Sequence, residues 1–280
     1  MSQNLSTSTA SPTPTSFATR YGPWALVLGG SEGIGECFAR RIAADGVNVV
    51  LVARRTEPLE AAAVAIRDAH GVEVRTASVD LTADDVGARL AAATDGLDVG
   101  LVVYNAGAGS GVPKFLETTR EQALALVRLN CNGPVEVAQH FGPGLVARGR
   151  GGLVFVTSMA AVVGAARTVT YGATKAFDLV FAEGLWAELA PQGVDVLAVV
   201  AGATDTPALA ATGANLASDA IVMMSADDVA REGLEHLGDG PTWVPGEANR
   251  AGFDFLRAMP RADAVNLLSA ATRSMYGFDD

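Results

Sequence analysis

The sequence has few of the residues on which disulfide-bonded and metal-binding proteins depend. Only two of its 280 residues are cysteines, Cys37 and Cys131, and they lie far apart. This predicts a reducing compartment rather than a disulfide framework. The three histidines, His70, His140 and His236, are isolated and lack metal-ligand spacing, so we expect no metal site.

Basic residues and long apolar runs are also scarce. The chain has 20 lysines and arginines against 31 acidic residues, a formal net charge of −11. Phosphate backbones and anionic membranes attract clustered cations, so we expect neither nucleic acid nor a membrane as a partner. No apolar run approaches the roughly 18 residues that cross a bilayer, and residues 1–20 lack the pattern of a secretory signal. We expect a cytoplasmic protein with a disordered tail over residues 1–20.

What the sequence does contain is a repeated alternation of short apolar, β-branched runs and longer helical stretches. The predicted strands are Trp24–Leu28, Val47–Ala53, Val72–Ser78, Val99–Tyr104, Leu153–Thr157 and Val194–Val200. The predicted helices include Ile34–Ala44, Pro58–His70, Ala83–Ala93, Glu121–Leu129, Tyr171–Leu189 and Ala226–Leu237. Strand–helix–strand repeats require right-handed crossovers and a parallel sheet covered on both faces. We therefore predict a Rossmann-type, doubly wound α/β fold in one domain over residues 21–280.

The first predicted strand runs directly into a glycine-rich segment that precedes a helix. Its residues are Gly29, Gly30, Ser31, Glu32, Gly33, Ile34 and Gly35. Glycines let a backbone approach a pyrophosphate, and a helix N-terminus offers free N–H groups and the positive end of its dipole. A tight turn without a ligand could use the same residues. The position between the first strand and the first helix of the domain favours a dinucleotide site.

The end of the second predicted strand indicates which dinucleotide binds. NAD-binding sites usually have an acid there that holds the ribose hydroxyls, whereas this strand ends in Arg54 and Arg55. A guanidinium group binds a phosphate through paired, charge-assisted hydrogen bonds, so we expect NADP(H), with NAD(H) less favoured. Two solvated residues at a helix start would look the same. Glu32 opposes a phosphate unless it pairs with one of these arginines.

A serine, a tyrosine and a lysine further along the chain can support acid–base chemistry. Tyr171 and Lys175 are one helical turn apart and share a helix face, and Ser158 follows a predicted strand. A phenol is a weak base at neutral pH, but a neighbouring ammonium and a cationic nicotinamide stabilise its anion. Such a tyrosine can give a proton to a forming alkoxide, while the serine hydroxyl binds the same oxygen. Alone, this tyrosine–lysine spacing is usually a cation beside a ring.

Together, these motifs resemble the short-chain dehydrogenases/reductases in their single-domain form, from Trp24 to about Trp243. Gly29, Gly33 and Gly35 are similar to the family's glycine loop. Two positions depart from the family pattern. Leu28 stands where threonine is frequent, and Ala201 replaces the usual proline before Gly202.

The resemblance implies roles for a set of residues. Asp80 and Leu81 would contact the adenine, and Asn105, Ala106 and Gly107 would lie beside the adenine ribose. Asn130, Ser158, Tyr171 and Lys175 would be the catalytic residues, with Lys175 also on the nicotinamide ribose and Asn130 holding a water chain. Gly202, Thr204 and Thr206 would lie at the nicotinamide, where Thr206 would meet its carboxamide.

The activity implied is a hydride transfer between the nicotinamide and a carbonyl or secondary alcohol, with Tyr171 as general acid/base. The resemblance also implies a homodimer or homotetramer that associates through the helices over 121–129 and 171–189. An alternative is a regulatory protein that binds NADP(H) without turnover. A methyltransferase is the weakest alternative, because it would leave the tyrosine–lysine pair without a role.

The segments over the carboxyl edge of the predicted sheet, 159–170 and 203–225, carry little charge. This favours a hydrophobic ketone or alcohol as substrate, although the same residues could merely pack a lid. Arg167 could meet an acidic substrate, but a solvent-facing role is more common for arginine.

The chain ends in residues 245–280, which depart from the family's short ending. Apolar residues at helical spacing predict a C-terminal extension of one or two amphipathic helices, broken at Pro260. This ending loosely resembles that of the hydroxysteroid and long-chain ketoacyl reductases. It could roof the pocket, pack on the core or form an interface.

Overall fold

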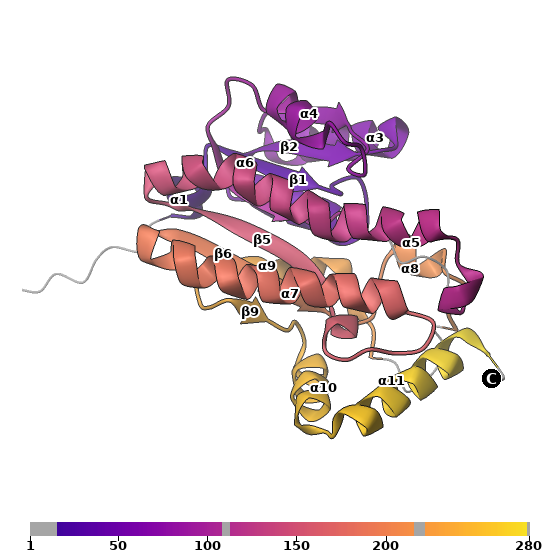
Figure 1. Cartoon of the computed structure of the whole chain (residues 1–280). Coiled ribbons are helices and arrows are strands. Elements are labelled where there is room, and N and C mark those ends of the chain that lie inside the picture. Colours follow the sequence, from indigo (N-terminus) through magenta and orange to yellow (C-terminus); the bar gives the residue numbers. More distant parts are fainter. Residues whose placement is uncertain (1–15, 108–112, 216–221, 279–280) are drawn as a thin grey trace, which may run out of the picture.

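A seven-stranded parallel sheet runs through the centre of the molecule (Figure 1). The computed structural model describes residues 16–107, 113–215 and 222–278. The strands are β1 (Trp24–Leu28), β2 (Asn48–Ala53), β3 (Val74–Ser78), β4 (Val99–Tyr104), β5 (Gly151–Ser158), β6 (Val194–Ala201) and β9 (Thr242–Trp243). Their order is β3-β2-β1-β4-β5-β6-β9. Strands β2 and β3 are added on one side of β1 and strand β4 on the other, so the strand order switches direction between β1 and β4. In such sheets a ligand site opens beyond the carboxyl ends of the strands at this point.

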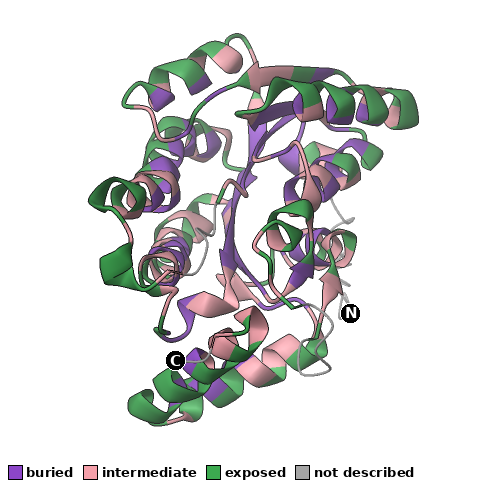
Figure 2. Cartoon of the chain, turned by 90° about the vertical axis from the view of Figure 1, so that its right-hand side faces the viewer, coloured by how far each residue is buried: buried purple, intermediate pink, exposed green. Residues whose placement is uncertain are grey.

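Helices cover both faces of the sheet (Figure 2). Successive strand residues point to opposite faces, so the strands contribute to two apolar clusters. On one face lie α2 (Gly33–Ala44), α3 (Thr56–His70) and α9 (Ala226–Glu235); on the other lie α4 (Val86–Ala93), α6 (Gly133–Arg148) and α7 (Val169–Leu189). The predicted doubly wound α/β fold is confirmed.

The helix that follows β4 is much longer than its predicted range of 121–129. It comprises α5 (Arg120–Val127), a π-helical turn η2 (Arg128–Asn132) and α6. The sequence signal for α6 was weak because Pro134 and Pro143, with several glycines, disfavour a helix interior. Pro134 lies in the first turn of α6, directly after the π-helical turn.

The N-terminal helix α1 (Phe17–Tyr21) ties the start of the chain to the sheet. Arg20 donates to both carboxylate oxygens of Asp195 on β6, at 2.5 and 2.6 Å, and the Tyr21 hydroxyl donates to the same carboxylate at 2.7 Å. The prediction of a disordered tail over residues 1–20 is therefore wrong for its last residues, 16–20. Residues 1–15 lie outside the described residues.

The C-terminal extension is helical, as predicted, and breaks at Pro260. Its helices are α10 (Glu247–Ala258) and α11 (Arg261–Tyr276). Phe253 and Leu256 of α10 pack on Val162 and Val163, which follow β5, in a third apolar cluster. The extension therefore packs on the core beside the carboxyl edge of the sheet. Among the described residues no helix combines the length and apolarity needed to span a bilayer.

Candidate active site

The glycine loop makes close backbone contacts at the end of β1. Gly29 has a φ of +80°, and a Cβ there would lie 2.8 Å from the backbone nitrogen of Ala106. A Cβ on Gly35 would clash with the carbonyl oxygen of Gly29 and lie 2.5 Å from Nδ2 of Asn105. That nitrogen donates to the Gly29 carbonyl at 3.1 Å. Glycine is therefore required where the loop, the end of β4 and the start of α2 meet.

The side chain at the N-cap of α2 makes no hydrogen bond to the N–H groups of the first turn. Ser31 lies in the loop, Glu32 occupies the N-cap position without a capping hydrogen bond, and Gly33 and Ile34 begin the helix. Glu32 instead forms an ion pair with Arg55. The leading N–H groups of α2 thus remain without a side-chain acceptor and are suited to an anion. Glu32 therefore has the arginine partner that the sequence analysis required if its carboxylate is to lie near a phosphate site.

Arg54 and Asp80 follow the neighbouring strands β2 and β3, so both lie at the carboxyl edge of the sheet. Arg54 is exposed just after β2, and its carbonyl accepts from the Ser78 hydroxyl of β3 at 3.0 Å. Asp80 Oδ1 accepts from the Thr82 N–H and hydroxyl at 2.9 and 2.8 Å, and these bonds hold the pKa of Asp80 below its ordinary value. The Asp80 carboxyl is therefore an anion at neutral pH, whereas the Leu81 side chain is buried in the core.

Lys175 is buried at the centre of the carboxyl edge, one turn after Tyr171 on α7. Its Nζ donates to the Val156 carbonyl of β5 at 2.9 Å and to Asp178 Oδ2 at 3.0 Å. The Thr157 hydroxyl donates to the Lys175 carbonyl at 2.7 Å and so fixes α7 against β5. Gly107 faces the same ammonium, since a Cβ there would lie 3.2 Å from Nζ.

Asn130 lies in the π-helical turn and is fully buried. Its Nδ2 donates to the Thr174 hydroxyl at 2.9 Å, which in turn donates to the Tyr171 carbonyl at 2.9 Å. In a π-helix the Leu129 carbonyl would accept a hydrogen bond from the N–H of residue 134, but this residue is a proline and has no N–H. The Tyr104 hydroxyl donates to the Leu129 carbonyl instead, at 2.5 Å. The π-turn thereby brings the predicted asparagine against the helix that carries Tyr171 and Lys175.

Ser158 ends β5 and begins the short turn η3 (Met159–Ala161). Its hydroxyl oxygen accepts from the Ala160 N–H at 3.2 Å, which leaves the hydroxyl proton available for another acceptor. α7 passes close to this turn, because a Cβ on Gly172 would lie 3.0 Å from the Ala160 carbonyl oxygen. The end of β5 and the first turn of α7 are therefore adjacent.

The residues after β6 use their hydroxyls within the protein. Thr204, in the two-residue strand β7 (Thr204–Asp205) beside β8 (Met224–Ser225), donates to the Gly202 carbonyl at 3.0 Å. Thr206 caps α8 (Pro207–Ala210) by accepting from the Leu209 N–H at 3.2 Å, and its side chain lies against Gly33. The side-chain amide of Asn249 in α10 packs directly against Gly202, because a Cβ on Gly202 would clash with it. This segment thus adjoins the glycine loop.

Asp178 is a site residue that sequence reasoning missed. It is buried on the inner face of α7, and desolvation raises the pKa of Asp178 to about 6, although Lys175 opposes the rise. A signal existed in the sequence. The acid lies three residues after Lys175, on the helix face that also carries Ala182, where an apolar residue is the usual choice.

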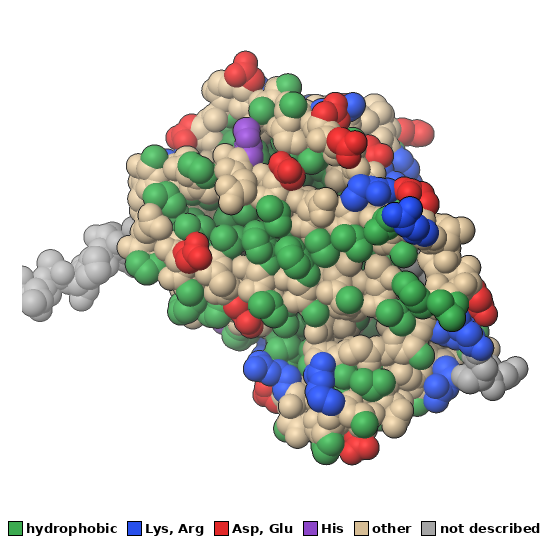
Figure 3. Space-filling view, viewed as in Figure 1, with side chains coloured by type: hydrophobic (Ala, Val, Ile, Leu, Met, Phe, Trp, Pro, Cys, Tyr) green, Lys and Arg blue, Asp and Glu red, His purple; other side chains and the backbone are tan. Residues whose placement is uncertain are grey.

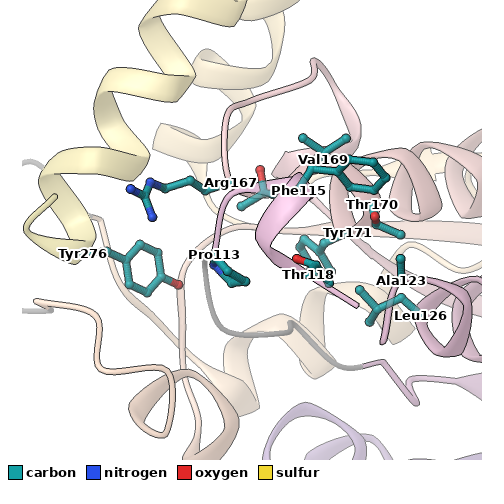
Figure 4. A pocket seen from close by; sticks show the side chains of 11 residues that line it. Pro113, Phe115, Thr118, Ala123, Leu126, Arg167, Val169, Thr170, Tyr171 and Tyr276 are labelled. Atoms are coloured by element: carbon teal, nitrogen blue, oxygen red, sulfur yellow. The ribbon is translucent and has the colours of Figure 1, made fainter. Parts of the chain in front are cut away.

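A small cavity of about 80 Å³ opens beside Tyr171 (Figure 4). The lining residues come from the segment before α5, from α5, from the start of α7 and from α11: Pro113, Phe115, Thr118, Ala123, Leu126, Arg167, Thr168, Val169, Thr170, Tyr171 and Tyr276. Arg167 has a φ of +68° and places its guanidinium 3.7 Å from the ring centre of Phe278. It is thus part of the cavity wall rather than a simple solvent-facing residue. Residues 216–221, which belong to the segment 203–225 expected over the pocket, lie outside the described residues.

Comparisons with known proteins agree with this architecture. The family model of the short chain dehydrogenases matches residues 23–217. A 7beta-hydroxysteroid dehydrogenase of Collinsella aerofaciens is 33% identical over 234 residues, which cover 82% of this chain and 89% of the relative. A solved structure of a 7beta-hydroxysteroid dehydrogenase superposes with a TM-score of 0.85 at 30% identity, covering 90% and 99% of the two chains. A short-chain dehydrogenase of Sphingobium yanoikuyae in complex with NADPH gives a TM-score of 0.76 at 30% identity, covering 89% and 96%.

Proposed function

Because the chain belongs to the short-chain dehydrogenase family, we propose that it is an NADP(H)-dependent oxidoreductase in which Tyr171 is the general acid and base. The family's enzymes transfer a hydride between a nicotinamide and a carbon that is a carbonyl in one state and an alcohol in the other. One observation carries the proposal most strongly. A buried, doubly anchored Lys175 lies one helical turn from Tyr171, which lines a cavity at the carboxyl edge of the sheet.

The residues at this edge fit a dinucleotide. The glycine loop has no room for a side chain at Gly29 or Gly35, and the first turn of α2 has no side-chain cap. Asn130 Oδ1 is buried without a partner among the described residues, so an acceptor is available next to Lys175. The nicotinamide would supply or receive the hydride. Arg54, Arg55 and the α2 N-terminus would hold its phosphates, while Asp80 and Asn105–Gly107 would lie along the adenosine.

In the direction of reduction, Tyr171 gives its hydroxyl proton to the oxygen of the substrate as that oxygen gains negative charge. Ser158 donates a hydrogen bond to the same oxygen. Lys175 stabilises the tyrosinate that is left behind, and Asn130 helps a water to return a proton to it. In the direction of oxidation the tyrosinate removes the proton from the alcohol.

The cavity supports an apolar ketone or alcohol as the substrate class. Most of its wall is aliphatic or aromatic, and apolar surface next to an acid–base pair is typical of sites for hydrophobic small molecules. Several curated relatives are named as hydroxysteroid dehydrogenases or 3-oxoacyl-CoA reductases, which supports the same substrate class. The polar groups of Arg167 and Tyr276 would then contact the end of the substrate that is remote from the reacting carbon.

The face formed by α6 and α7 supports a homo-oligomer, although the resemblance implied association through the helix over 121–129, rather than α6, together with the helix over 171–189. Hydrophobic side chains form a band across this face (Figure 3), and Val135, Val180 and Trp186 on these helices are exposed. Exposed apolar bands on stable proteins commonly mark interfaces. Light scattering of the purified chain should therefore give the mass of two or four copies. A monomer at micromolar concentration would contradict the oligomer.

The function is tested by replacing Tyr171 with phenylalanine, which removes one hydroxyl and keeps the ring. The variant should bind NADPH as tightly as the wild type in a calorimetric titration but lose at least ~1,000-fold in kcat for ketone reduction, because the proton donor is gone. A panel of apolar ketones, followed by NADPH absorbance, identifies the working substrate first. Near-wild-type turnover by Tyr171→Phe would overturn the mechanism.

A further inference from the structure

The acid that contacts Lys175 has no part in the mechanism described so far. Counted over the whole residue, Asp178 is 1% exposed to solvent and Lys175 is 4% exposed. The Lys175 ammonium has three N–H donors, of which Val156 on β5 and Asp178 accept two. One donor is therefore left for the site, and its direction depends on the other two.

Stability does not explain the presence of this acid. Burying an ion pair costs desolvation energy that can exceed the attraction between the two charges, and apolar residues of similar size are often as good or better. Asp178 Oδ1 is buried without a hydrogen-bond partner among the described residues, which adds to the cost. Ala182, one turn further on the same face, is fully buried, so an apolar side chain would suit this environment.

The groups around Asp178 identify Lys175 as its partner. In the part of the chain that the structure describes, three titratable groups interact with it: Lys175 on α7, Tyr104 on β4 and Cys131 in η2. Burial raises the pKa of Tyr104 far above its ordinary value and that of Cys131 to about 11. Both are therefore neutral near pH 7, and the charge that Asp178 meets is the ammonium of Lys175.

From this geometry we infer that Asp178 is a positioning residue for the proposed reaction: it orients Lys175 and offsets its charge, and so sets the pH range in which Tyr171 works. This inference rests on the proposed function. When Asp178 is ionised, the pair is neutral and the tyrosinate receives less stabilisation. When Asp178 is protonated, the ammonium is uncompensated and stabilises the tyrosinate more strongly. The ionised acid thus keeps the action of Tyr171 as a base at higher pH than a neutral residue at this position would.

The kinetic test replaces Asp178 with asparagine, which has nearly the same shape and can still accept from Lys175 but carries no charge. The acid limb of the pH profile for alcohol oxidation should move to lower pH by about one unit, because the ammonium is then uncompensated at every pH. Glu188→Gln removes one carboxylate from the exposed end of the same helix and should leave the profile unchanged. Equal profiles for the wild type and Asp178→Asn would overturn the inference.

A second measurement needs no turnover. The chain contains only two lysines, Lys114 and Lys175, so Lys114→Arg leaves a single lysine signal in the NMR spectrum of protein labelled with ¹³C-lysine. Because burial raises the pKa of Asp178 to about 6, the Lys175 side-chain signal should shift with a midpoint near that pH. The shift should vanish in Lys114→Arg/Asp178→Asn. A signal that is insensitive to pH between about 5 and 8 in the Asp178 protein would contradict the pairing, even if the asparagine variant folds poorly.

The two proposals fail in distinguishable ways. If Tyr171→Phe retains turnover, the proposed function fails, whereas the lysine titration still decides whether Asp178 offsets the charge of Lys175. If Tyr171→Phe is inactive but Asp178→Asn keeps both the wild-type pH profile and a titrating lysine signal, only the role of Asp178 fails.

Discussion

Two ion pairs lie along the proposed cofactor site, and their surroundings differ sharply. At the rim, the side chains of Arg55 and Glu32 are 65% and 36% exposed. At the centre, those of Lys175 and Asp178 are 5% and 2% exposed. An exposed pair contributes at most about 1 kcal/mol and is screened by salt, so a ligand phosphate can displace its acid. Breaking a buried pair leaves a desolvated charge. The rim can therefore exchange partners, whereas the centre keeps its partner.

The largest effect is expected when the buried pair loses its cation. Lys175→Met should lower the free energy of unfolding by ~3–5 kcal/mol, because Asp178 is left without its counter-charge in the core. Urea unfolding at neutral pH measures this loss. Adding Asp178→Asn to the same chain should recover most of the stability without restoring turnover. A loss below ~1 kcal/mol in the single variant would mean that the central pair resembles the rim pair.

The next effect concerns the cations of the rim. Replacing Arg54 and Arg55 together with alanine should weaken NADPH binding about 30-fold, since charge-assisted hydrogen bonds to the 2′-phosphate are lost. NADH binding should change by less than about threefold, because its ribose carries no such phosphate. Calorimetric titration of both cofactors gives the ratio. Equal losses for the two cofactors would remove the assignment of NADP(H).

The buried acid should also leave a mark on stability as the pH changes. Its pKa in the folded protein, about 6, is higher than the ordinary value of 3.8, so the folded state binds more protons between these values. The stabilising contribution is therefore complete below about pH 4 and is lost as the pH rises through 6. Relative to the wild type, Asp178→Asn should gain about 1.4 kcal/mol of unfolding free energy between pH 5 and pH 8. A difference that is constant over this range would contradict the raised pKa.

The smallest effect is expected at the acid of the rim. Glu32→Gln releases Arg55 and removes a negative charge near the proposed phosphate, so NADPH should bind about threefold more tightly at low salt. The free energy of unfolding should change by less than ~1 kcal/mol, since the pair is exposed. Fluorescence titration at two salt concentrations measures the gain. Weaker NADPH binding would instead mean that the Glu32 carboxylate itself holds part of the cofactor.

The parts of the fold that local chemistry determines could be predicted from the sequence. The β1–α2 turn was predicted from its glycines, and the structure leaves no room for another residue at Gly29 and Gly35. Strands β1 to β6 were predicted, most of them because their apolar runs are nearly continuous, whereas the two-residue strand β9 was not. The helix break at Pro260 follows from the ring of proline itself.

Other features depend on distant partners and could not be predicted in this way. α6 forms in spite of Pro143 because the sheet covers its inner face, and Asn130 reaches Thr174 only through a π-turn that the Tyr104 hydroxyl completes. α1 is held by Asp195, a residue far away in the sequence. Helical spacing places Asp178 on the same face of α7 as Lys175 and Ala182, but the importance of this acid appears only when its burial and its contact with Lys175 are known.

The most direct test of the account follows the hydride itself. NADPH carrying deuterium at the transferable position of its nicotinamide is incubated with the wild-type protein and an apolar ketone that it reduces, and the product alcohol is examined by mass spectrometry and NMR. We expect one deuterium per product, on the carbon that bears the new hydroxyl, and no labelled product with Tyr171→Phe. Alcohol without deuterium at that carbon, or equal labelling by the phenylalanine variant, would contradict hydride transfer assisted by Tyr171.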